Sequence, residues 1–144
     1  MFKKIVVAYN ESKEAGRALH TAIQLAKSLN AELHAVTVMA GLPAYAAFAE
    51  ATDPSLSKML EEDQERSHAS IRQTAMKLAN ENGIELRGHV VRGHEIEVIV
   101  DFLRREKADL LVVGLHKSDL YIARLWSTVY ELAQESPCSV LGVH

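Results

Sequence analysis

Short runs of β-branched and apolar residues alternate with segments of helical spacing along this chain of 144 residues. The run at 109–115, DLLVVGL, is apolar at almost every position, which is typical of a strand buried on both faces of a parallel sheet. Parallel neighbours need a long crossover connection, and the helical segments between the runs supply it. The alternation therefore predicts an α/β fold: a doubly wound, five-stranded parallel sheet with helices on both faces.

The predicted elements cover most of the chain. The first helix, over 11–30, has Ser12 as its N-cap and Asn30 at its C-terminal end. The segment 39–55 has turn residues and no persuasive period, so we expect an excursion over the sheet edge and the most mobile part of the chain. Strands are predicted at 4–9, 32–38, 84–91, 109–115 and 139–144, and the other helices at about 55–82, 94–108 and 119–135.

The bulk properties predict a single domain over residues 1–144 and exclude several classes of partner. A net charge of −3 and a pI near 6.2 offer no general attraction for nucleic acid or for an anionic membrane. Cys138 is the only cysteine, so an internal disulfide is excluded. The apolar stretch near the N-terminus is too short for a signal peptide or a membrane span, and we expect a cytoplasmic protein.

The carboxyl ends of the predicted strands form the edge at which open α/β sheets bind ligands. Asn10 follows the first strand at this edge, and Gly114 lies at the end of the fourth. His94 and His116 also follow strands, but no Cys/His/Asp cluster has metal-ligand spacing and no Ser or Cys stands in a nucleophile elbow. We therefore expect loop histidines, no metal and no catalytic residue.

Two separated blocks of the sequence resemble the universal stress protein family. The first is KKIVVAYNESKEAGRALHTAIQLAKSLNAELHAVTV, and the second is ADLLVVGLHK followed by STVYELAQESPCSVLGV. The resemblance implies a Rossmann-like, adenine-nucleotide alpha-hydrolase-like fold with strand order 3-2-1-4-5. It also implies a homodimer joined through the last strand, residues 139–144, whose low charge is typical of an edge that pairs with another copy.

Many members of that family bind ATP through an aspartate just past the first strand and a loop of the form Gly-x2-Gly-x9-Gly-Ser/Thr past the fourth. Glycines let backbone N–H groups close on the phosphates. Gly114 matches the first loop glycine, but Lys117 replaces the second and Trp126 the third, in a loop that is one residue shorter. Asn10 replaces the aspartate, and Glu11 stands where a glycine often follows it. In these respects the chain resembles the UspA-type branch, which lacks the glycine-rich loop.

Two functions remain open from the sequence. The first is a non-catalytic stress-response module, regulatory or protective, with weak or absent ATP binding, because Trp126 fills phosphate space and the Glu11 carboxylate repels phosphate. The second is a switch that binds ATP or AMP, with slow ATP hydrolysis as a further activity. No cofactor is certain, ATP or another adenine nucleotide is the candidate, and the sequence identifies no regulatory partner. The candidate nucleotide-binding residues are Ala8, Tyr9, Asn10, Val38, Val113, Gly114, Lys117, Ser127 and Thr128.

Three of these departures also have simpler interpretations. Asn10 suits an ordinary Asx turn after a strand, and Lys117 suits a solvated loop. The apolar residues of the predicted helix recur at three- and four-residue spacing, at Tyr121, Leu125, Val129 and Leu132, and the indole of Trp126 suits a packing contact near them in the core.

Overall fold

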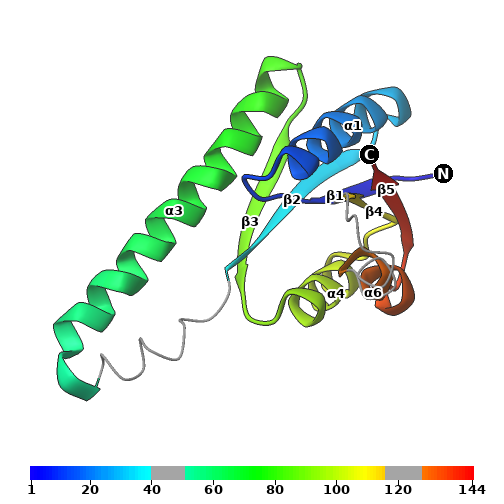
Figure 1. Ribbon diagram of the computed structural model, residues 1–144. Helices are drawn as coiled ribbons and strands as arrows, with labels where there is room; N and C mark the ends of the chain where they lie inside the picture. The colour runs from blue at the N-terminus through cyan, green and yellow to red at the C-terminus, as the bar shows by residue number, and fades with distance from the viewer. Residues whose placement is uncertain (40–50, 116–127) are drawn as a thin grey trace.

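A computed structural model describes residues 1–39, 51–115 and 128–144. Its centre is a five-stranded sheet in the order β3-β2-β1-β4-β5, and every neighbouring pair is parallel (Figure 1). The strands are β1 (Lys4–Ala8), β2 (Glu32–Met39), β3 (Leu86–Arg92), β4 (Leu110–Gly114) and β5 (Ser139–Val143). The doubly wound parallel sheet predicted from the alternating pattern is confirmed, and so is the strand order that the family resemblance implies.

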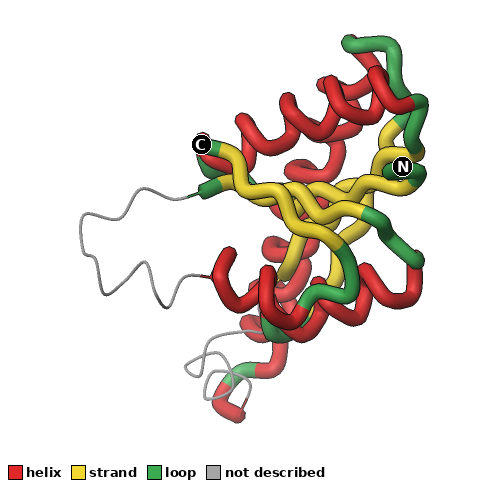
Figure 2. The backbone as a smooth tube through the Cα atoms, turned by 90° about the vertical axis from the view of Figure 1, so that its right-hand side faces the viewer, coloured by secondary structure: helices red, strands yellow, loops and turns green. Residues whose placement is uncertain are grey.

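The helices lie in two layers, one on each face of the sheet (Figure 2). They are α1 (Lys13–Leu29), α3 (Pro54–Glu81), α4 (Glu95–Glu106) and α6 (Thr128–Glu135). Side chains of a strand alternate between the faces, so Ile5 and Val7 pack against α1 and α3 while Val6 packs against α4 and α6. We call these two clusters of buried side chains the α1/α3 core and the α4/α6 core.

Helix α1 begins and ends as its sequence predicts. The Ser12 Oγ accepts a hydrogen bond from the Ala15 backbone N–H at 3.1 Å, which satisfies one of the free donors of the first turn. At the other end, Asn30 adopts the left-handed conformation with φ 52°, which asparagine tolerates better than most residues. Local side-chain chemistry therefore sets both ends of this helix.

Helix α3 is long, and only its C-terminal half lies against the sheet. Its Ala75 and Ala79 belong to the α1/α3 core and Ile71 is buried one turn earlier, as predicted from their spacing. The N-terminal half extends away from the sheet (Figure 1). The helix starts one residue earlier than expected, because Asp53 accepts a hydrogen bond from the Ser55 N–H at 3.1 Å and caps it.

The remaining boundaries agree within two residues where the chain is described. The third strand covers Leu86–Arg92 rather than 84–91, because the turn at Gly83, with φ 77°, is followed by two residues that do not join the ladder. The predicted mobility of 39–55 concerns mainly residues 40–50, and the predicted helix start near 119 also lies outside the described residues. Within the described parts of the chain, every helix is too short or too polar to cross a membrane.

Candidate functional site

The end of β1 turns sharply into α1 at the carboxyl edge of the sheet. The Tyr9 N–H donates to the Val36 carbonyl at 3.0 Å and continues the ladder by one residue beyond Ala8. The Asn10 Oδ1 then accepts a hydrogen bond from the Ser12 N–H at 2.9 Å, which is an Asx turn. The oxygen of Asn10 is therefore engaged in its own turn, and the amide NH2 is the group of this side chain that can contact a ligand.

Gly114 lies at the end of β4, where the first turn of α1 comes very close. A Cβ added to Gly114 would lie 2.4 Å from both the carbonyl carbon and the oxygen of Glu14. Any larger residue would push α1 off the sheet, so packing requires a glycine here whether or not a nucleotide binds. The Leu115 N–H donates to the Val143 carbonyl at 2.7 Å and extends the contact with β5.

The structure brings three of the predicted site residues to one face of the sheet. Ala8, Val38 and Val113 come from three neighbouring strands and all pack with the α4/α6 core. Val113 is only 3% exposed, whereas Ala8 and Val38 are half-buried near the edge. Ala8 and Val38 are thus the apolar side chains of this set that a ligand can reach.

Tyr9 does not join this group, because its ring packs on the α1/α3 core on the opposite face of the sheet. Burial, and then the nearby charge of Glu11, raises the pKa of the phenol, so the hydroxyl stays protonated at neutral pH. Thr128, the first residue of α6, is exposed. Lys117 and Ser127 lie outside the described residues.

The histidine and cysteine positions were expected to have no metal-binding or catalytic role. His94 is an exposed residue at the N-cap of α4, and its side chain makes no capping hydrogen bond. His116 lies outside the described residues. Burial raises the pKa of the Cys138 thiol, which lies 3.4 Å from the Ser136 hydroxyl, so the thiol is protonated at neutral pH. No group of three metal-binding side chains occurs within 1–39, 51–115 and 128–144.

Two surface grooves occur among the described residues. One of about 560 Å3 runs between β3 and α4, with Val91 and Val98 as its apolar residues and Arg92 and Arg105 among its charged ones. The other, of about 520 Å3, lies between α1 and the end of β5. The second groove includes Val143, which pairs in register with Gly114, but none of the described candidate nucleotide-binding residues is among the residues that line either groove.

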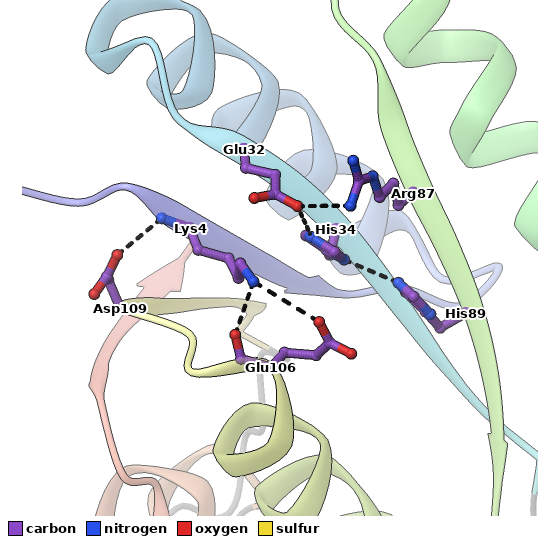
Figure 3. Close-up of polar contacts among 7 residues, drawn as sticks. All are labelled: Lys4, Glu32, His34, Arg87, His89, Glu106 and Asp109. Atoms are coloured by element: carbon purple, nitrogen blue, oxygen red, sulfur yellow. Dashed lines mark hydrogen bonds and ion pairs between the residues drawn. The ribbon is translucent and has the colours of Figure 1, made fainter.

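Sequence reasoning missed one polar cluster inside the fold. His34, in the middle of β2, contacts Glu32 on its own strand and His89 on β3 (Figure 3). A histidine in the apolar run ELHAVTV was a signal, because a buried polar group needs a partner. The identity of that partner depends on the register in which β2 pairs with β3, which the sequence does not reveal.

Comparison with known proteins adds the following. All of the chain, residues 1–144, matches the universal stress protein family. Universal stress protein MJ0531 of Methanocaldococcus jannaschii is 29% identical over 144 residues, which make up 99% of this chain and 82% of that protein. A solved universal stress protein in complex with cAMP is 25% identical, with a TM-score of 0.78 over 99% of this chain and 97% of that one. UspA from Lactobacillus plantarum shares the fold, with a TM-score of 0.77, 22% identity and coverage of 99% and 98%.

Proposed function

Because the chain belongs to the universal stress protein family, we propose that it is a non-catalytic stress-response module, regulatory or protective, that binds ATP weakly or not at all. The observation that carries this proposal is the presence of Lys117 and Trp126 where ATP-binding members have loop glycines. In ATP-binding members, glycines at these two positions let backbone N–H groups close on the phosphates, and this chain carries a lysine and a tryptophan side chain there.

The end of β1 supports the same proposal. The Asn10 Oδ1 accepts the Ser12 N–H in the Asx turn, and an asparagine lacks the charge of the aspartate found in ATP-binding members. Glu11 is exposed beside this turn, and its charge contributes to the raised pKa of Tyr9. A carboxylate at this place disfavours a polyphosphate unless a cation lies between them.

A second candidate function is a switch that binds an adenine nucleotide with a single phosphate. It is favoured by the likeness to the universal stress protein in complex with cAMP. Ala8 and Val38 offer apolar contacts on one face of the sheet, which an adenine ring could use. AMP or cAMP requires fewer backbone N–H groups than ATP and so tolerates the loss of the loop glycines better.

The proposed assembly is a homodimer joined through β5. This strand is at the edge of the sheet, and the side chain of Leu141 on it is 36% exposed. Its sequence from Ser139 to Val143 has no charged residue that would discourage pairing with a second copy.

Calorimetric titration of nucleotide-stripped protein with ATP, AMP and cAMP tests the two functions. The main proposal expects no ATP binding at micromolar concentration, with or without magnesium, and no release of phosphate from ATP. Tight ATP binding or turnover would overturn it. Binding of AMP or cAMP that is lost in Val38→Asp but kept in Thr74→Ala, an exposed control on α3, would establish the second function at this edge of the sheet.

A further inference from the structure

His34 and His89 form a hydrogen-bonded pair between β2 and β3, on the face of the sheet that α4 covers (Figure 3). The two nitrogens that meet, Nδ1 of His34 and Nε2 of His89, are 2.9 Å apart. The ring centroids are 5.1 Å apart and the ring planes differ by 12°. With the nitrogens so close and the centroids so far apart, the rings lie nearly edge to edge, which is the arrangement of an in-plane N–H···N hydrogen bond.

The pair is anchored at both ends. The other nitrogen of His34, Nε2, lies 2.8 Å from the Glu32 carboxylate, and His34 is only 1% exposed. At the other end, the ring of His89 lies against Phe102 of α4, with centroids 4.8 Å apart and an interplanar angle of 59°. A continuous contact therefore runs from the exposed Glu32, through buried His34, to the edge strand β3 and α4.

The number of protons that this geometry can hold follows from the donors and acceptors. An ionised carboxylate only accepts hydrogen bonds, so Nε2 of His34 carries a proton. A single proton then lies between His34 and His89, because two N–H groups cannot point at each other across 2.9 Å. Starting from two neutral rings, the pair can bind one more proton, on either ring, and keep this hydrogen bond. A second proton would make both rings imidazolium, with two N–H groups facing each other, and would break the contact.

Charged groups from five elements surround the pair. The hydrogen bond with His34 is the largest cause of the lowered pKa of Glu32, and the Arg87 guanidinium lies 3.0 Å from the same carboxylate. Around His89, burial and the charge of His34 lower its pKa, Arg87 and Arg72 of α3 add to this, and Glu106 of α4 opposes it. Lys4 on β1 also acts on Glu32, and it donates to the Glu106 carbonyl at 2.9 Å.

We propose that the His34–His89 pair is a pH-sensitive latch that keeps the edge strand β3 against β2 and α4. The hydrogen bond between the rings holds when both rings are neutral and when one of them is charged. When a second proton binds and both rings are charged, His89 separates from His34 and loses its packing on Phe102. Strand β3 then loosens at the edge of the sheet.

Contacts between β3 and β2 link the latch to the carboxyl edge of the sheet. His89 pairs in register with Val36, and Val38 lies two residues further along β2. At the end of β3, the Gly93 N–H donates to the Met39 carbonyl at 3.1 Å. Loosening of β3 therefore reaches the last residue of β2 that is described, whether or not a nucleotide binds there.

Imidazole ¹⁵N and ¹H NMR of the full chain, titrated from pH 8 to pH 4.5, is the direct test. We expect a protonated Nε2 on His34 at pH 8, and two protonation steps for the pair that are separated by more than about one pH unit. The second step should coincide with loss of the ring-current shift from Phe102. Two histidines that titrate independently, or an unprotonated Nε2 on His34 at pH 8, would overturn the proposal.

Hydrogen exchange of β3 amides, corrected for intrinsic pH dependence and compared with β1, provides a second measurement. In the parent chain, we expect protection of β3 to fall about tenfold more than that of β1 across the second step. His89→Phe keeps an aromatic ring for Phe102 and removes the titration, so this differential loss should disappear. The exposed His20→Gln is the matched control and should behave as the parent. An unchanged differential loss in His89→Phe would refute the latch.

Discussion

Replacement of Gly114 by alanine separates a structural from a ligand-binding role for this residue. The added Cβ would lie 2.4 Å from two backbone atoms of Glu14, and ordinary contact requires a separation about 1 Å greater. Backbone atoms of a helix cannot rotate away as a flexible side chain can, so α1 must shift against β4. Overpacking of this kind costs about 1 to 3 kcal/mol, and at about 3 °C per kcal/mol the Tm should fall by about 3 to 9 °C.

Gly16→Ala is the matched control, because it adds the same methyl group to the helix that Gly114 contacts. Nothing lies within 4 Å of a Cβ built at Gly16, and alanine is a better helix former than glycine. This variant should gain about 0.5 to 1 kcal/mol in the free energy of unfolding. Urea denaturation of both variants at pH 7.5, without nucleotide, measures the two effects. If Gly114→Ala is as stable as the parent, close packing by α1 does not explain this glycine.

Three other variants test separate parts of the structure. The triple variant Glu11→Gly, Lys117→Gly, Trp126→Gly should bind ATP more tightly than the parent in calorimetry, although loss of the indole costs about 3 to 5 kcal/mol if it packs in the core; equal, undetectable binding by two folded proteins would contradict this. Truncation after Pro137 removes β5 and should abolish the dimer in light scattering, whereas a monomeric parent at micromolar concentration would refute that assembly. Asp109 accepts hydrogen bonds from two backbone N–H groups at 2.8 Å, and these lower the pKa of its carboxyl group. The ionised carboxylate therefore stabilises the fold above about pH 3.9, and this stabilisation is lost as the pH falls through the lower pKa of the folded state. Asp109→Asn should therefore be less stable than the parent at pH 6 and lose less stability below pH 4, and parallel curves of unfolding free energy against pH would contradict this.

Much of the fold was predictable because its signals are local. Apolar runs such as Leu110–Gly114 must be covered on both faces, and the helical segments between the runs leave parallel pairing as the consistent solution. The ends of α1 were predictable for the same reason, since Ser12 and Asn30 act within one turn of their own positions. The order of the strands came from the family resemblance, because sheet order depends on contacts between segments far apart in the chain.

The tertiary structure decided how the candidate residues are arranged. A strand sends consecutive side chains to opposite faces, so Ala8 and Tyr9, adjacent in sequence, pack with different cores. The contact between Gly114 and Glu14 joins residues a hundred positions apart, and no local pattern could show that packing alone requires this glycine. His34 and His89 are separated by 55 residues and meet only because β2 and β3 pair in one particular register. Residue types and local spacing determined which elements form, whereas the partners of these side chains followed from strand register and helix packing, which are properties of the whole chain.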